Sequence, residues 1–470
     1  MFTIQNQNRV AAYDADNDLT ATYKELILIS KKKIFSKKKA LFLVLCENSM
    51  GCLATYFSIV QKKNIAMLAS SKITNDDLST LIKKFKPNYL ALPQSYCYKG
   101  NKLKKVEIVY NYKIIKIFLN KKFQINNQIK LLLSTSGTTT EKKWAKISQK
   151  NIQSNLVGII KSLKIKADDI AITTLPFEYS YGLSIINTHL FMNAKIILTK
   201  KSVIENDFWN ILKKYKVTNF GGVEFTYEIL EKIRFGKFLN GSHLKYLSQA
   251  GSALNPELHK KIYRILNKNK IKLYIMYGMT EAGPRISIMR DDGNIKKRNY
   301  LSVGKEIDGV KVFVKNNKSK TNKVGQLYLS SKSIFGGYAK KIVHLKIFKN
   351  QKILKLGDLG YFDQKKFLFI TGRSNRICKI KGIRINLAVV EKHIKQKLRC
   401  NTHLVSDDRK IYIFSNENKI KKINKSDLKK ILNININDIS IKFIREIPKS
   451  ENRKTSYSGL MKLINNEKIL

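Results

Sequence analysis

The sequence is poor in the features that mark several protein classes. Only 6 of its 470 residues are Pro, and neither a Pro/Gly/Ser-rich linker nor an internal repeat divides it. Its 5 Cys form no CxxC pair and have no His at ligand spacing, which is typical of reduced thiols in the cytosol. No apolar run approaches the ~20 residues of a membrane span, and no signal-peptide pattern opens the chain. The sequence therefore predicts a cytoplasmic globular protein with no membrane span.

Acidic residues are also scarce. The chain has 34 Asp and Glu against 90 Lys and Arg, for a net charge of +56. Such a charge is compatible with a nucleic-acid or anionic-membrane partner. However, 77 of the basic residues are Lys and only 13 are Arg, and they are spread along the whole chain. Nucleic-acid readers favour Arg, so we interpret the charge as compositional bias of an AT-rich genome, with no specific nucleic-acid partner.

Short apolar runs alternate with amphipathic stretches, which favours an α/β fold. Examples are a strand over 40–45 followed by a helix over 53–61, and a strand over 194–199 followed by a helix over 207–215. After about residue 300 strands dominate, at 310–314, 326–330 and 367–371, and the C-terminal part is expected to contain a strand at 411–414 and a helix near 425–432. We predict α/β subdomains and a small β-barrel-like part in a large N-terminal domain, residues 1–373, and a small α+β C-terminal domain, residues 374–470.

The segment Ser134–Lys143 reads STSGTTTEKK and follows an apolar strand at 131–133. Small hydroxyl residues and a Gly predict a tight loop whose N–H groups, hydroxyls and final ammonium face one concavity. Such a collection of donors suits a polyphosphate. Taken alone, the segment is equally compatible with an ordinary surface loop.

Further segments carry isolated chemical groups. Tyr277–Glu281 (YGMTE) places a carboxylate just past a Gly turn, where it can hold Mg²⁺. Leu356–Gly360 (LGDLG) places an Asp between glycines, where it can accept ribose hydroxyls. Lys379–Ile385 (KIKGIRI) and Ile447–Lys454 (IPKSENRK) are basic segments near the C-terminus. Each alone is compatible with an ordinary turn or a solvated face.

Together and in this order, the segments resemble the adenylate-forming superfamily, which includes acyl-CoA synthetases, peptide-synthetase adenylation domains and firefly luciferase. The resemblance extends over essentially the whole chain. Leu19–Leu26 resembles the opening segment of the family, and Leu175–Leu183 (LPFEYSYGL) its acid-pocket segment. Gln249–Ser252 and Gly325–Leu327 match two further segments in position.

The resemblance implies roles for individual residues. It implies ATP binding by Thr135, Ser136, Gly137, Thr138, Thr139, Lys143, Gly251, Ser252, Tyr277, Asp358 and Arg373. It implies catalytic roles for Lys454, Thr280 and Glu281, of which Glu281 would also hold Mg²⁺. It implies a substrate pocket formed by Tyr179, Ser180, Tyr181, Gly221, Gly222, Phe225 and Met279. Lys379 and Gly382 would border a tunnel for the thiol, on a small domain that moves about a hinge at Asn375.

The implied reaction is the AMP-forming ligation of a small carboxylic acid to a thiol, with ATP, Mg²⁺ and CoA. Alternatives are a ligase that loads the phosphopantetheine of an acyl carrier protein in trans, and an inactive basic binding protein of the same fold. The sequence departs from the family at several positions, including Thr140, Tyr179, Glu224, Asn375 and Arg453. These departures leave the acid and its acceptor open.

Overall fold

The computed structural model describes the 470-residue chain except residues 37–38, 99–103, 118–122, 136–142, 291–292, 295–298, 316–323, 374–375, 381–382, 408, 423, 425–427, 429–434, 450–454 and 468–470. The described residues form two compact units. Unit 1 contains Met1–Thr135, Lys143–Val312 and Leu329–Leu354, and unit 2 contains the described parts of 313–328 and 355–470. No helix in the described chain is long and apolar enough to cross a membrane.

The first sheet of unit 1 has eight strands among the described residues, in the order β19-β9-β8-β4-β3-β5-β7-β6. The strands are β3 (Leu41–Cys46), β4 (Ile65–Ser70), β5 (Tyr89–Pro93), β6 (Lys104–Val109), β7 (Tyr112–Lys116), β8 (Ile129–Ser134), β9 (Trp144–Ser148) and β19 (Tyr338–Ala339). The central strands β5, β3, β4 and β8 are parallel, and β8 pairs antiparallel with β9. The parallel strands are predominantly apolar because both faces of the sheet are covered.

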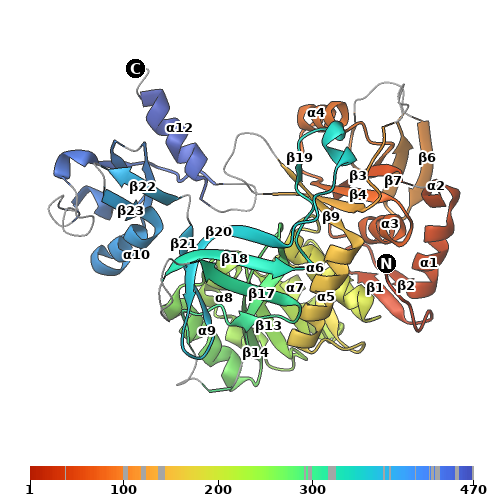
Figure 1. The fold of residues 1–470 in the computed structure, drawn as a ribbon. Coiled ribbons are helices and arrows are strands. Elements are labelled where there is room, and N and C mark those ends of the chain that lie inside the picture. Colours follow the sequence, from red (N-terminus) through yellow and green to blue (C-terminus); the bar gives the residue numbers. More distant parts are fainter. Residues whose placement is uncertain are drawn as a thin grey trace. The chain divides into compact units, whose positions relative to one another are not determined.

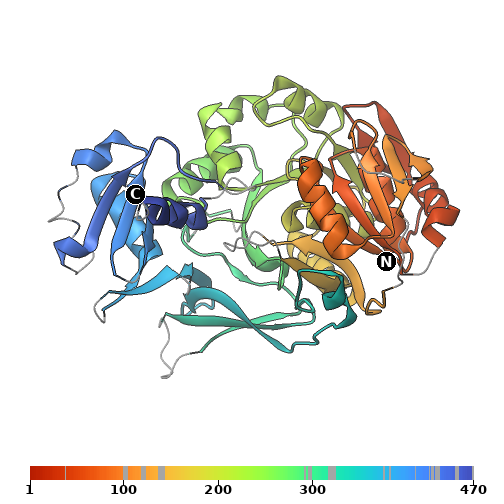
Figure 2. The same ribbon diagram turned by 90° about the horizontal axis from the view of Figure 1, so that it is seen from above.

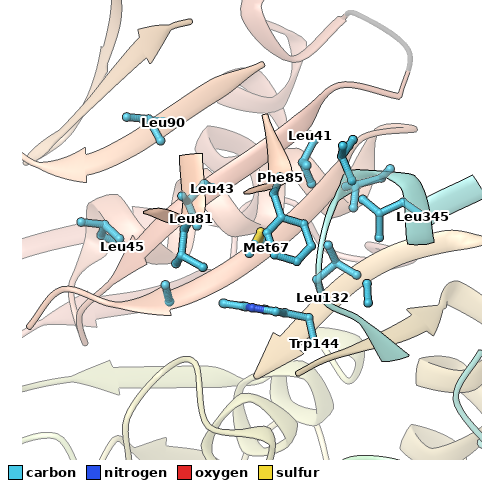
Figure 3. Close-up of a cluster of buried hydrophobic side chains, with 14 of the residues drawn as sticks. Leu41, Leu43, Leu45, Met67, Leu81, Phe85, Leu90, Leu132, Trp144 and Leu345 are labelled. Atoms are coloured by element: carbon cyan, nitrogen blue, oxygen red, sulfur yellow. The ribbon is translucent and has the colours of Figure 1, made fainter. Parts of the chain in front are cut away.

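Helices α3 (Met50–Gln61) and α4 (Asn75–Phe85) lie on opposite faces of this sheet (Figure 1). The face toward α4 holds a cluster of buried side chains in which Phe85, Met67 and Trp144 pack together (Figure 3). Leu345, from the 3₁₀ helix η2 (Ile342–Lys346), joins the same cluster. The cluster anchors the strands β8 and β9, which carry the two ends of the predicted phosphate loop.

The second sheet of unit 1 has nine strands in the described residues, in the order β16-β15-β14-β13-β12-β10-β11-β1-β2. They are β1 (Val10–Asp14), β2 (Leu19–Thr22), β10 (Ile170–Ile172), β11 (Lys195–Leu198), β12 (Asn219–Gly222), β13 (Tyr246–Gln249), β14 (Lys272–Met279), β15 (Gly283–Met289) and β16 (Lys305–Glu306). Strands β10, β12, β13 and β14 are parallel neighbours. Strand β15 turns back antiparallel along β14.

The remaining helices of unit 1 begin at recognisable caps. Thr22 and Ser148 form capping boxes at the starts of α1 and α5, and Asn255 with Pro256 opens α9. The helices are α1 (Tyr23–Lys31), α2 (Lys33–Ser36), α5 (Gln149–Leu163), α6 (Ser180–Phe191), α7 (Asn206–Lys214), α8 (Glu224–Lys232), η1 (Phe235–Phe238) and α9 (Pro256–Lys268). Helices α5 and α6 pack against β15, the second strand of the β14–β15 hairpin.

Unit 2 is built from smaller sheets. One sheet consists of β17 (Val310–Lys315), β18 (Gly325–Ser331), β20 (Ile353–Phe362) and β21 (Leu368–Arg373). Three of these strands, β17, β18 and β20, have one end that belongs to unit 1. β22 (Ile377–Ile380) pairs with β23 (Ile383–Asn386), and β24 (His403–Ser406), β25 (Ile411–Ser415) and β26 (Ile439–Phe443) form another sheet. Its helices are α10 (Leu387–Leu398), η4 (Asn418–Lys422), η5 (Ile436–Asp438) and α12 (Tyr457–Glu467).

Helix α12, the dark blue helix of Figure 2, packs along β24. Leu460 and Ile464 of this helix share a buried cluster with Val405, Phe414 and Ile447. The cluster fixes the residues on either side of 450–454, the segment that contains Lys454. Lys454 itself lies outside the described residues.

The predicted mixed α/β fold is confirmed. The strands expected at 40–45, 194–199, 310–314 and 411–414 and the helices expected at 53–61 and 207–215 are present, with ends shifted by a few residues. The helix expected near 425–432 lies almost wholly outside the described residues. The boundary at residue 373 stays a prediction, because it concerns which part of the chain moves.

Candidate active site

Several predicted site residues follow the carboxyl ends of neighbouring parallel strands. Gly222 on β12 is level with Gln249 on β13, and Gln249 is level with Ile275 on β14. The pocket glycines, the loop Gly251–Ser252 and the segment starting at Tyr277 therefore lie at one edge of the sheet, where α/β proteins bind ligands. Gln249 Nε2 donates to the Ser252 carbonyl at 2.7 Å and closes this loop, in which Gly251 has a φ of +98°.

Thr280 and Glu281 lie at the tip of the β14–β15 hairpin. Met279 pairs with Gly283, and a bulge between Tyr277 and Met279 shifts the register. A side chain at Gly278 would collide with the Pro284 carbonyl on the facing strand, so only Gly fits there. Thr280 Oγ1 donates to Ser180 Oγ at 3.2 Å, which connects the hairpin tip to the first residue of α6.

Glu281 is held by a neighbour that the sequence analysis did not identify. The Tyr338 hydroxyl donates to Glu281 Oε1 at 2.6 Å, and the Phe335 N–H donates to the Glu281 carbonyl at 2.9 Å. Burial, the Glu281 charge and this hydrogen bond raise the pKa of Tyr338, so the hydroxyl keeps its proton. Lys143 Nζ lies 5.8 Å from the Tyr338 ring centroid. Tyr338 is thus close to both the loop Lys and the predicted metal ligand.

The predicted phosphate loop starts and ends at one point. The Thr135 N–H donates to the Lys143 carbonyl at 3.0 Å, next to the Ser134–Trp144 pair of β8 and β9. Ser136, Gly137, Thr138 and Thr139 lie outside the described residues, so their role stays a prediction.

The predicted pocket residues divide into a buried set and more exposed ones. The Tyr181 hydroxyl bonds the Ser248 carbonyl and Oγ, both at 2.8 Å, and its ring lies edge-on to Tyr179 with centroids 6.3 Å apart. A Cβ at Gly221 would meet the Tyr181 hydroxyl at 2.7 Å, so this glycine makes room for the Tyr. Phe225, on the first turn of α8, is 39% exposed.

A cavity of about 40 Å³ lies under the Ser180–Thr280 contact, with Asn155 and Asn187 in its wall. This is near the volume of one water molecule. The cavity is therefore too small to be the acid pocket.

The structure adds a charged residue beside the pocket. Arg285 on β15 is 1% exposed, and its guanidinium carbon lies 4.0 Å from the Tyr181 ring centroid. The one available sequence signal was a charged residue directly before the mostly apolar stretch Ile286–Met289. Tyr338 had a weaker signal, an aromatic residue after two glycines.

In unit 2 the predicted ribose ligand and its neighbour are directly opposite each other. Asp358 on β20 pairs with Arg373 on β21, and Arg373 Nε lies 3.4 Å from Asp358 Oδ1. Gln326 Nε2 donates to the Asp358 carbonyl at 3.0 Å, so the GQL segment supports the same strand. The Asp358 side chain is only 9% exposed while that of Arg373 is 61% exposed. Asp358 is thus oriented mainly by its strand.

The C-terminal residues are only partly described. Lys379 pairs with Arg384 across β22 and β23, while Gly382, between these strands, lies outside the described residues. On the two sides of 450–454, Lys449 and Thr455 form a β-bridge and the Ser456 N–H donates to the Pro448 carbonyl at 2.7 Å.

A partly buried ion pair supports the same region. Arg376 donates to both oxygens of Glu391, at 2.7 and 3.1 Å, and stacks on Tyr457 at 3.7 Å. Glu391 also accepts from the Leu404 N–H and the Tyr457 hydroxyl. The network attaches the start of α12 to α10 and β24.

Comparison with known proteins identifies the class. A family model described as AMP-binding enzyme matches residues 33–339, well over half of the chain. The chain belongs to this family, and the predicted membership of the adenylate-forming superfamily is confirmed.

Individual relatives are distant. The chain is 26% identical over 271 residues to an oxalate–CoA ligase of Saccharomyces cerevisiae, covering 56% of this chain and 48% of that protein. It is 23% identical over 361 residues to a 2-succinylbenzoate–CoA ligase of Bacillus cereus, covering 74% and 71%. The chain spans about half the length of most of the curated relatives it matches.

Solved structures share the fold. ATP-bound MatB from Rhodopseudomonas palustris superposes with a TM-score of 0.77 at 16% identity, over 99% of this chain and 97% of the other. The o-succinylbenzoate CoA synthetase MenE from Bacillus subtilis, in complex with an acyl-adenylate, gives 0.73 at 16% identity over 97% and 96%. At this identity the likeness shows a common fold.

Proposed function

We propose that this chain is an AMP-forming acid–thiol ligase that activates a small carboxylic acid with ATP and passes the acyl group to CoA. The observation that carries the proposal is the hairpin tip, where Thr280 contacts Ser180 of the acid-pocket segment and Glu281 is oriented by Tyr338 beside Lys143. One point of unit 1 thus brings together groups suited to the acid, the metal and the phosphates. The comparisons support the class, since relatives include several CoA ligases.

The first step makes the carboxylate a good acyl donor. Its oxygen attacks the α-phosphorus of ATP, pyrophosphate leaves, and an acyl-AMP forms. Such a step needs positioning and charge stabilisation rather than a protein nucleophile. In the proposed reaction Thr280 donates to the α-phosphate, and Lys143 and Lys454 supply positive charge. The thiol then attacks the acyl carbon, and AMP leaves.

The residues present fit Mg²⁺. The ion prefers oxygen ligands and is commonly held by one or two carboxylates together with substrate phosphates. No group of three or more His, Cys, Asp or Glu side chains in the described chain could enclose an ion by itself. Glu281, fixed through Oε1 by Tyr338, therefore fits as the protein ligand of a metal that the nucleotide brings. When bound, the ion neutralises phosphate charge.

The names of the relatives leave the acid open, since they range from oxalate and sulfoacetate to luciferin. The acceptor is open as well. We assign CoA in preference to a carrier protein because several relatives are named as CoA ligases.

The test is acid-dependent exchange of labelled pyrophosphate into ATP, followed by AMP release with CoA or with a phosphopantetheinyl carrier. We expect exchange with at least one acid and thioester formation with CoA. Glu281→Gln should lower exchange about 10²- to 10³-fold, while Glu228→Gln, at an exposed position on α8, should not. ATP binding without exchange for any acid would instead indicate an inactive binding protein. Transfer to the carrier alone would replace CoA as the acceptor.

A further inference from the structure

Arg285 is a buried charge without a counter-ion in the described structure. Among the residues described, the groups that act on it electrostatically are the hydroxyls of Tyr181, Tyr179 and Tyr246, and none of these is a carboxylate. Burial lowers the pKa of the guanidinium, but an Arg stays protonated in proteins. Placing such a charge in an aromatic surrounding without an anion is costly.

Its hydrogen bonds are also incomplete. Nε donates to Met276 Sδ at 3.0 Å, a weak acceptor, and Nη1 donates to the Pro284 carbonyl at 2.9 Å. A guanidinium has five N–H groups. The second N–H of Nη1 and both of Nη2 meet no acceptor among the residues described. These N–H groups belong to the end of the fork that binds a carboxylate through two parallel hydrogen bonds.

The side chain is held firmly. Asn155 Nδ2 on α5 donates to the Arg285 carbonyl at 2.7 Å, and the Tyr181 ring covers one face of the guanidinium. Tyr181 is in turn fixed by two hydrogen bonds to Ser248. A charge that is fixed in this way is preorganised, so binding a ligand does not have to order the side chain.

Arg285 lies beside the candidate active site. It adjoins Gly278 across the hairpin, because a Cβ on Gly278 would meet the Arg285 N–H group. Its platform Tyr181 follows Ser180, which accepts the hydrogen bond of Thr280. Tyr181, assigned to the acid pocket, covers the guanidinium with its ring, and Tyr179 of the same pocket acts on it electrostatically. The unpaired end of the Arg therefore belongs to the acid side of the site.

We propose that Arg285 binds a second anionic group on the acid, so that the substrate is a carboxylic acid with a further carboxylate. This inference rests on the proposed function, since it names the class of acid that the same site activates. One carboxylate of the acid would lie near Thr280 and react, and the other would pair with the guanidinium. A neutral group in its place would leave the buried charge without a partner, which is the source of strong discrimination.

The first test uses the wild-type protein. Pyrophosphate exchange is measured with succinate, glutarate and phthalate, each against its monoamide, which keeps the shape and loses the second charge. We expect kcat/KM to be on the order of 100-fold higher for at least one diacid than for its monoamide. Equal rates for acids and monoamides would overturn the inference and leave the proposed function intact. The absence of exchange with every acid, monocarboxylates included, would overturn both.

The second test changes the charge. Arg285→Met should remove the preference for the diacid while retaining exchange with a monoamide, and Arg285→Lys should keep part of the preference. Arg290→Met, at an exposed position just after the same strand, is the matched control and should behave like wild type. Diacids should also raise the melting temperature of the wild type and not that of Arg285→Met.

If Arg285 has only a structural role, another result is expected. In that case Arg285→Met would lower exchange equally for diacid and monoamide, and the ratio of the two would stay at its wild-type value. This outcome would overturn the assignment. If Arg285→Met does not fold, the wild-type panel and Arg285→Lys decide.

Discussion

The candidate site depends on contacts of single residues whose partners are distant in sequence. Tyr338 reaches Glu281 because the two-residue strand β19 pairs with β9 beside Lys143. The hydroxyl restricts the orientation of the Glu281 carboxylate, which we propose as the ligand of Mg²⁺. A residue that acts in this way is a positioning residue, and its effect depends on the metal concentration.

Tyr338→Phe should therefore raise the Mg²⁺ concentration needed for half-maximal pyrophosphate exchange and lower the rate about 10-fold, in line with the loss of a hydrogen bond to a charged group. The control is Tyr328→Phe, whose ring stacks on Phe313 and should be unaffected by the loss of its hydroxyl. An unchanged Mg²⁺ dependence in Tyr338→Phe would show that the hydroxyl does not orient the metal ligand.

The environment of His403 predicts that the stability of unit 2 depends on pH. Burial, followed by the charges of Arg376 and Lys395, lowers the pKa of His403 from 6.5 to about 4. Between these values the unfolded chain binds a proton and the folded chain does not, so the stability present above 6.5 is lost as the pH falls toward 4. The loss is on the order of 3 kcal/mol at most.

His403→Gln should flatten this dependence. Melting temperatures at about pH 7 and about pH 5 should differ less in the variant than in the wild type. The exposed His243 provides the matched control, since His243→Gln should retain the wild-type difference. If the melting temperatures at the two pH values differ as much in His403→Gln as in the wild type, His403 is excluded as the source of the pH effect.

At the scale of elements, the strands with strong apolar character could be predicted from the sequence. The motif segments were expected at strand ends because apolar runs precede them, and β8 and β14 do precede their motifs. The antiparallel return of β15 was not foreseen, since Pro284 and Arg285 interrupt its apolar pattern. Helix α12 was not foreseen either, because Tyr457–Glu467 mixes polar and apolar residues and is stabilised by packing on β24.

Long-range contacts had no sequence signal. The pairing of β19 with β9 and the stacking of Arg285 on Tyr181 join segments far apart in the chain. Short strands such as β19, with two residues, carry no periodicity. The motif segments and their positions after strands could thus be predicted by order, whereas the long-range contacts made by Tyr338 and Arg285 could not.

The β14–β15 hairpin gives a prediction at this scale. Gly278→Ala should destabilise unit 1 by about 1–3 kcal/mol, because the added methyl meets backbone atoms of Pro284 and Arg285 that cannot give way. Urea unfolding measures the change. Gly236→Ala, where the nearest atom is the flexible side chain of Ile265, should cost less than about 1 kcal/mol. Equal effects would show that the facing strand shifts to accept the methyl group.

At the scale of the molecule, unit 2 holds two groups assigned to different steps. The predicted movement of the C-terminal part would bring the Lys454 segment for adenylation and the Gly382 segment for thioester formation. The network of Arg376, Glu391 and Tyr457 then matters for the first step, because it fixes the helix that begins three residues after Lys454.

Two substitutions should therefore separate the half-reactions. Lys454→Ala should lower pyrophosphate exchange about 10²- to 10³-fold with little change in ATP binding, since its charge would stabilise the transition state. Gly382→Leu should leave exchange largely intact and block transfer to CoA, because the added side chain would fill the path of the pantetheine arm. Lys449→Ala, at an exposed position on the same segment, serves as the control for lost positive charge.

The pattern across the two variants tests whether one site serves two reactions in turn. If Lys454→Ala and Gly382→Leu both damaged both steps equally in folded protein, the two segments would act together and no exchange of poses would be needed. If Gly382→Leu spared both steps, the thiol would reach the acyl-AMP by another path. The proposed movement requires that Lys454→Ala loses only adenylation and that Gly382→Leu loses only thioester formation. This result alone agrees with a C-terminal part that presents Lys454 first and the Gly382 segment second.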